Sequence, residues 1–124
     1  MTTDELATAV LAMRKRDHVS FAELAREWPE HFRDGRFEIR SSVAPNLVIW
    51  VGVSETCADA LEKIKNRTVA YEAASSPLVY LIDGCTLNYP LAKAKSRKAL
   101  HSYKRPHWIP TVMRPIERAR PSQL

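Results

Sequence analysis

The stretch Leu47-Val48-Ile49-Trp50-Val51-Gly52-Val53 decides the fold of this chain, because it is the longest apolar run in the sequence. A run of this length without polar alternation is typical of a strand that is covered on both faces. The cover comes either from the chain's own helices, which we favour, or from a second copy of the protein. The run is far too short to span a bilayer, so no membrane association is predicted.

The residues before this run predict its partner strand. Phe37-Glu38-Ile39-Arg40 alternates apolar and charged side chains, and Ala44-Pro45-Asn46 has the composition of a turn. The sequence therefore predicts a hairpin between residues 37 and 53.

A helix is predicted directly after the run. Ser54 is a suitable N-cap, and Cys57, Leu61 and Ile64 recur on one helical face. This helix ends in a basic cluster at positions 63–67, so its carboxyl end carries positive charge.

Two further helices are predicted upstream. Leu6, Val10 and Met13 recur at helical spacing, and Ser20-Phe21-Ala22-Glu23 has the spacing of a capping box. Pro29 interrupts the second of these helices.

Downstream, Thr68 to Ala73 and Leu78 to Ile82 are two β-rich runs joined by a short polar linker, which predicts a second hairpin. The last forty residues hold five of the eight prolines, which leaves room for a short helix from Leu91 to His101 and an extended chain beyond it. Together these elements predict an α+β fold with a body over residues 1–84 and an arm over residues 85–124, packed on the body or extending from it.

The charge of the chain changes sign near Gly84. Residues 1–83 carry ten Lys/Arg and thirteen Asp/Glu, whereas residues 84–124 carry nine Lys/Arg and one Glu. A basic arm on an acidic body is typical of a small domain with a surface for a polyanion, and nucleic acid, DNA first, is the expected partner. The alternative is that the arm pairs with the carboxylates of the body, which would weaken its attraction for nucleic acid.

The order of predicted elements resembles the winged-helix family of helix-turn-helix domains. The resemblance is carried by the first-helix pattern, by Phe21-Ala22-Glu23-Leu24-Ala25, and by Ala60 to Val69 as a third helix entering a strand and its wing. It covers about two thirds of the chain, and its motifs have low specificity. One departure from the family pattern is the extra hairpin between the second and third helices.

In DNA-binding members of this family the third helix enters the major groove. Here Glu55 and Asp59 lie on the corresponding helix, which makes a poor face for phosphate. The resemblance thus implies a smaller contribution from the end of this helix, through Lys63, Lys65 and Arg67.

The arm carries the stronger signal for nucleic acid. Cations neutralise phosphates and aromatic rings stack on unpaired bases. Trp108 and Tyr103 are the candidate stacking groups, although Trp108 followed by Ile109-Pro110 is equally expected to pin the arm onto the body. The candidate contacts in the arm are Lys93, Lys95, Arg97, Lys98, Lys104, Arg105 and Trp108.

No catalytic motif accompanies these features. The sequence has no glycine-rich phosphate loop and no His/Cys set at metal-ligand spacing, so no enzyme activity, cofactor or metal is predicted. The alternative is a metal-dependent nuclease built on scattered acids such as Asp34, Glu38 and Asp83. Cys57 and Cys85 are expected to be ordinary packing or surface thiols.

The sequence therefore predicts a cytoplasmic accessory or regulatory protein that binds nucleic acid through its basic arm. The alternative is a protein-interaction module, such as a plasmid- or phage-encoded inhibitor or adaptor, whose basic arm occupies an acidic or nucleic-acid-binding site on another protein. In this alternative the Leu47 to Val53 strand is an edge or a dimer surface.

Overall fold

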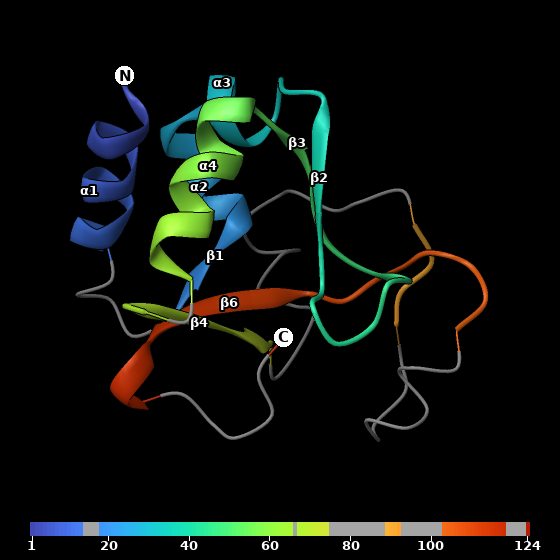
Figure 1. Cartoon of the computed structure of the whole chain (residues 1–124). Helices are drawn as coiled ribbons and strands as arrows, with labels where there is room; N and C mark the ends of the chain where they lie inside the picture. Colours follow the sequence, from blue (N-terminus) through green and yellow to red (C-terminus); the bar gives the residue numbers. More distant parts are fainter. Residues whose placement is uncertain (14–17, 66, 75–88, 93–102, 119–123) are drawn as a thin grey trace.

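The computed structural model describes residues 1–13, 18–65, 67–74, 89–92, 103–118 and 124 (Figure 1). It has an α+β fold, as predicted. The described elements, in chain order, are α1 (Thr3–Met13), β1 (Val19–Ser20), α2 (Phe21–Glu27), α3 (Pro29–Phe32), β2 (Phe37–Arg40), β3 (Leu47–Val53), α4 (Glu55–Ile64), β4 (Val69–Ala73), β5 (His107–Trp108), β6 (Thr111–Pro115) and the 3₁₀ turn η1 (Ile116–Arg118).

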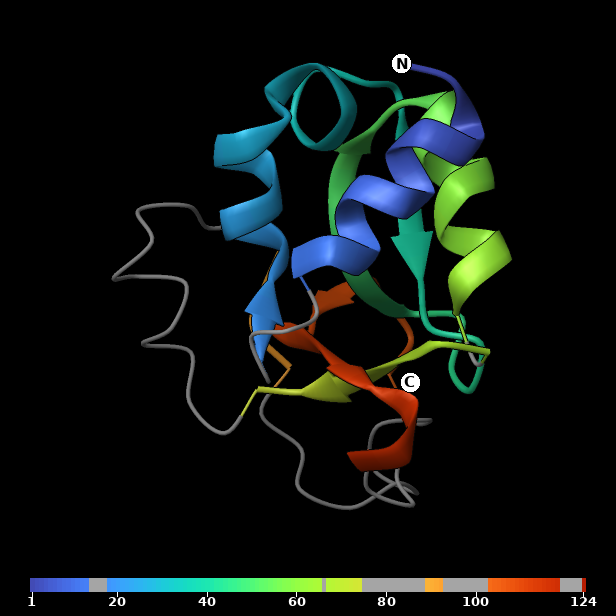
Figure 2. The ribbon, with the colours of Figure 1, turned by 90° about the vertical axis from the view of Figure 1, so that its left-hand side faces the viewer.

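The strands form two small sheets. One is antiparallel with the order β1-β6-β4, and the other has the order β2-β3-β5, with β5 parallel to β3. In Figure 1 the β2–β3 hairpin runs crosswise to β4 and β6, and the helices lie together on one side of both sheets. Figure 2 shows α1, α2 and α4 above β4 and β6, so the core lies between the helices and the two sheets.

The predicted starts of α2 and α4 match the structure, whereas the short helix α3, which begins at Pro29, was not predicted. The capping box at α2 is present: the Glu23 N–H donates to Ser20 Oγ over 3.1 Å, and the Ser20 N–H donates to Glu23 Oε1 over 3.4 Å. Ser54 caps α4 by accepting the Cys57 N–H at 3.0 Å. These caps satisfy amide groups that a helix start leaves without partners.

The second predicted hairpin is only partly described. Val69–Ala73 is a strand, as expected, and its described partner is Thr111–Pro115, far along the chain. The predicted strand at residues 78–82 and residues 93–101 of the predicted helix lie outside the described residues. Leu91 itself is not helical, because it forms a parallel bridge with Trp108.

The strand β3 is covered by the chain's own side chains. Six of its seven residues are buried, and Trp50, at 1 % exposure, donates from Nε1 to the Phe32 carbonyl oxygen over 2.6 Å. The favoured prediction, that the chain's own side chains cover this strand, is confirmed. The alternative, a dimer surface that includes Trp50, does not fit the burial of this ring within one chain.

Two glycines let the α3–β2 loop lie against β3. Gly52 has a φ of +95°, and a Cβ there would lie 2.3 Å from the Arg33 carbonyl oxygen. A Cβ at Gly35 would lie 2.2 Å from the Val53 carbonyl carbon, and the Gly35 N–H donates to the Gly52 oxygen over 2.9 Å. The β2–β3 register shifts at this point, so Gly52 forms a bulge that only glycine fits.

We expect Gly52→Ala to lower the free energy of unfolding by roughly 2–4 kcal/mol, because it combines a disfavoured φ with a backbone clash. Urea denaturation followed by circular dichroism measures this. The control is Val51→Ala at the neighbouring exposed position, with an expected loss below about 1 kcal/mol. Equal losses for the two variants would contradict the proposed role of the bulge.

Trp50→Ala is expected to cost about 3–5 kcal/mol, because it leaves a cavity and removes the donor to Phe32. The same denaturation experiment measures the loss. Sedimentation at matched concentrations should show no change of oligomeric mass specific to this variant. A folded variant of unchanged stability with a lower mass would restore the dimer interpretation.

Candidate nucleic-acid interface

We call Tyr103–Trp108, which leads into β5, the basic segment of the arm. Lys104 and Arg105 are exposed, and no described carboxylate forms an ion pair with either side chain. The predicted contacts Lys93, Lys95, Arg97 and Lys98 lie outside the described residues. Lys104 and Arg105 are therefore the predicted phosphate contacts of the arm that the structure places, whereas Arg114 of β6 pairs with Glu72 of β4 at 3.2 Å.

This segment is fastened to the turn of the β2–β3 hairpin through one residue. The Asn46 side-chain amide donates to the Tyr103 carbonyl oxygen over 2.8 Å, and the His107 N–H donates to the Asn46 carbonyl oxygen over 2.8 Å. Asn46 thus holds both ends of the loop that carries Lys104 and Arg105. A loop held at both ends loses less conformational entropy when it binds a ligand.

The same loop presents two stacked rings. The ring centroids of Tyr103 and His107 lie 3.9 Å apart, with 23° between the ring planes. Both side chains are half-buried, and His107 Nδ1 lies 2.8 Å from the Arg105 carbonyl oxygen. A ring pair from the same loop as two exposed cations combines a stacking surface for bases with charge for phosphates.

The stacking role predicted for Trp108 does not fit its position. Trp108 is 5 % exposed and belongs to the core, and its main chain bonds to Pro90 and Ala92. Burial of the large apolar ring accounts for this, and it matches the alternative that Trp108 pins the arm to the body. Tyr103 remains the candidate stacking group.

The three cations predicted at the end of α4 do not form one surface. Lys63 Nζ makes an exposed ion pair with Asp4 Oδ1 of α1 at 2.7 Å. Lys65 instead turns inward, where Nζ lies 4.8 Å from the centroid of the Tyr71 ring and donates to the Leu124 carbonyl oxygen over 3.1 Å. Desolvation by burial lowers the pKa of Lys65.

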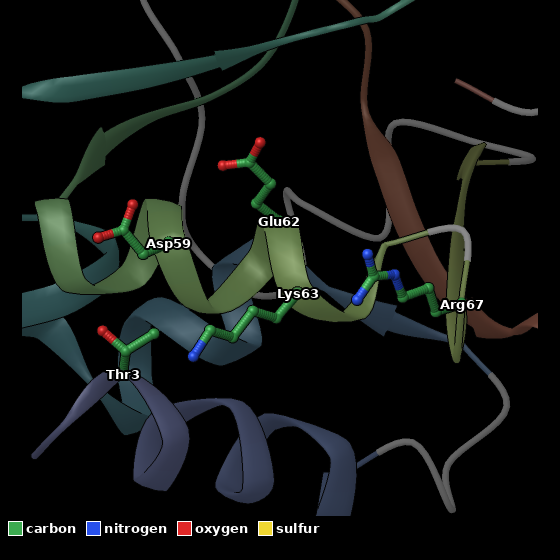
Figure 3. A pocket seen from close by; sticks show the side chains of 5 residues that line it. All are labelled: Thr3, Asp59, Glu62, Lys63 and Arg67. Atoms are coloured by element: carbon green, nitrogen blue, oxygen red, sulfur yellow. The ribbon is translucent and has the colours of Figure 1, made fainter.

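Arg67 and Lys63 line a shallow pocket of about 430 Å³ between α1 and α4 (Figure 3). Asp59 and Glu62 of α4 line the same pocket, together with Thr3. Two carboxylates beside two cations leave little net positive charge there. The pocket is thus a poor site for phosphate.

The outward face of α4 is also acidic. Glu55, Asp59 and Glu62 are exposed on this helix, and Lys63 is its one exposed cation. A phosphate backbone laid along this face would meet like charge. The geometry therefore agrees with the expectation that this helix is not the main phosphate contact.

Two of the acids considered for a nuclease site are engaged elsewhere. Asp34 pairs with Arg33 at 3.4 Å, and Glu38 accepts from Arg40 at 2.6 Å and from the Tyr89 hydroxyl at 3.0 Å. The hydrogen bond from the Tyr89 hydroxyl to Glu38, together with the negative charge of Glu38, raises the pKa of Tyr89. Asp83 lies outside the described residues. No group of three or more His, Cys, Asp or Glu that could hold a metal ion occurs among the residues that the structure describes.

Sequence reasoning missed Asn46 and Leu124. Asn46 is 57 positions from Tyr103, and Leu124 is 82 and 83 positions from the serines that bond to it. No local pattern marks contacts at these separations, because Asn, Ser and Leu are ordinary turn and core residues.

Comparison with protein-family models, with curated proteins and with solved structures gave no match. Within the described ranges, every helix is too short or too polar to cross a membrane.

Cys57 is fully buried, and desolvation raises its pKa from 9.0 to about 12. In a Cys85→Ser background, we expect the native protein to resist a maleimide reagent at pH 8 and to react promptly after unfolding in guanidinium chloride. Because the folded pKa is raised, the contribution of this thiol to stability is fully present below pH 9 and declines as the pH rises toward 12. Rapid labelling of the native protein would contradict the burial of Cys57.

Proposed function

We propose that this protein is a winged-helix-like nucleic-acid-binding protein with an accessory or regulatory role. The contact to phosphates is made by the basic segment around Lys104 and Arg105 rather than by α4. The observation that carries the proposal is the exposed pair of cations beside the stacked rings of Tyr103 and His107.

The order of the helices supports the winged-helix part of the proposal. The helices α1, α2 and α4 stand where the resemblance implies a first, second and third helix, and α4 is followed by the strand β4. The run at residues 78–82 that was expected to complete the wing lies outside the described residues, and the described partner of β4 is β6. The second sheet is an addition to this layout, built from the hairpin β2–β3 and from β5.

The anchoring of the basic segment supports the binding part of the proposal. Asn46 holds Tyr103 and His107, and the next residues, Trp108 and Ile109, are buried in the core. A site on a fixed loop keeps its cations in place before the ligand arrives. The stacked rings favour DNA with unpaired or distorted bases among the nucleic acids.

A protein-interaction module is the second candidate function. Phe37 and Val51 are 50 % and 37 % exposed and lie on the outer part of the β2–β3 hairpin. Exposed apolar residues on a strand pair favour a protein partner. This candidate predicts a partner protein and no affinity for nucleic acid.

Fluorescence anisotropy with labelled single-stranded and duplex DNA at several salt concentrations tests the first proposal. If five cations of the arm contact duplex phosphates, log K should fall with log salt at a slope of about −4.5. We expect Lys104→Gln combined with Arg105→Gln to make this slope shallower by about 1.8, which is two contacts at roughly 0.9 each.

The matched control is Arg33→Gln combined with Arg36→Gln, which removes the same charge from the exposed α3–β2 loop. This control should change the salt slope by less than about half of the change expected for the Lys104 and Arg105 double variant. Binding that is absent at low salt would reject the proposal and favour the interaction module.

A further inference from the structure

The strand β2 has an open edge. It stands at the end of the sheet order β2-β3-β5, and the Ser41 N–H that follows it donates to the Leu47 carbonyl oxygen at the start of β3 over 2.9 Å. The main-chain groups of successive strand residues alternate in direction, so Ile39 faces β3 like Ser41, and the N–H and C=O groups of Glu38 and Arg40 point outward. Outside the β2–β3 ladder, no described group bonds to these outward donors and acceptors.

A groove of about 230 Å³ lies along this edge, between β2 and α4. Its apolar lining comes from Ile39 of β2, from Ala58 and Leu61 of α4, and from Tyr71 of β4. In Figure 1 the helix α4 stands beside β2. A strand that is added to β2 would therefore place every second side chain in the groove, against the helix.

The free charge at the groove is negative. Of the four charged side chains that line it, Glu38 and Arg40 pair with each other at 2.6 Å, and Lys65 turns inward over the ring of Tyr71. Glu62 is exposed and forms no ion pair with a cation in the described part of the chain. Figure 3 shows its carboxylate pointing away from α1.

We propose that the outer edge of β2 and the groove beside α4 form a docking site for an extended, basic segment of a partner protein. The segment adds a strand to the sheet by bonding to the outward main-chain groups of Glu38 and Arg40, and it places a lysine or arginine beside Glu62. In strand addition the main-chain bonds supply affinity, and the pockets for alternate side chains supply specificity. This inference goes beyond the nucleic-acid proposal and does not rest on it.

The charge of α4 favours a basic partner over a second copy of this chain. Glu55, Asp59 and Glu62 are exposed on this helix. Pairing of two β2 edges about a two-fold axis would bring two such acidic helices together, and like charges repel. A nucleic acid would meet the same carboxylates, whereas a basic segment meets opposite charge.

The probe is a fluorescein-labelled heptapeptide, Thr-Val-Thr-Lys-Thr-Val-Thr, with both ends capped. As a strand it presents the two valines and the lysine on one face, because side chains alternate. Titration with the full-length protein should give saturable binding in fluorescence anisotropy. Absence of binding at millimolar protein would overturn the inference.

N-methylation shows whether the peptide binds as a strand. Methyl groups on the amides of its third and fifth residues block one edge of the peptide, and methyl groups on its fourth and sixth residues block the other. We expect one of these peptides to bind at least about tenfold more weakly than the parent, because two main-chain bonds are lost, and the other to change less than about threefold. Equal losses for the two peptides would overturn strand addition.

Glu62→Gln tests the charge of the groove. With the wild-type protein, glutamine in place of the peptide's lysine should weaken binding by about threefold, the size expected for an exposed ion pair. With Glu62→Gln the two peptides should bind equally. The matched control is Asp59→Asn, which removes a carboxylate that lines the other side of the same helix and should keep the preference for lysine. A preference that survives in Glu62→Gln would overturn the proposed contact.

Amide hydrogen exchange identifies the edge and its occupant. The amides of Glu38 and Arg40 should exchange rapidly in the free protein and at least about tenfold more slowly with saturating peptide, whereas the Ile39 amide should be protected in both states. Protection of Glu38 and Arg40 that grows with protein concentration alone would overturn the inference in favour of a second copy. Protection by a single-stranded oligonucleotide and not by the peptide would overturn it in favour of nucleic acid.

Discussion

The fold depends on the ring of Phe21, which joins the parts of the molecule. Its centroid lies 6.1 Å from Trp50 of β3, 5.6 Å from Tyr71 of β4 and 6.3 Å from Phe32 of α3. One side chain of α2 therefore contacts both sheets and the following helix. Offset and edge-on ring pairs contribute about 0.5–1.5 kcal/mol each beyond burial, so this cluster ties elements that share no main-chain hydrogen bonds.

The short connection between β5 and β6 joins the two sheets. Trp108 is the last residue of β5 and Thr111 the first of β6, so only Ile109 and Pro110 separate a strand of one sheet from a strand of the other. Both connecting residues are buried. The strand that follows the basic segment is therefore joined to both sheets within a few residues.

The sequence predicted the local elements well because their signals are local. The Ser20–Glu23 capping box and the Ser54 cap need only a few consecutive residues. The partner of β4 was not predictable in the same way. Thr111–Pro115 does not have a typical strand pattern, because Arg114 is charged and Pro115 has low strand propensity. Its partner, Val69–Ala73, also lies about forty positions earlier in the sequence.

The sequence predicted where the positive charge of the candidate site lies, but not how its side chains are arranged. The positions of Lys and Arg located the basic segment, but composition does not show in which direction each side chain points. Trp108 and Lys65 illustrate this limit, because both face inward, one into the core and the other toward Leu124. Their neighbours Arg105 and Arg67 are exposed. Whether such a side chain faces the core or the solvent depends on tertiary packing against residues that lie more than fifty positions away in the sequence.

The distribution of charge gives the molecule two unlike ends. The exposed carboxylates Glu55, Asp59 and Glu62 gather on α4, whereas Lys104 and Arg105 stand on the loop beside the turn of the β2–β3 hairpin. Under the proposed function, repulsion at the helix and attraction at the loop would act together, because a polyanion feels the field of the whole surface before it makes contact. The acidic helix would then help to orient such a ligand, because the basic segment is the favourable approach.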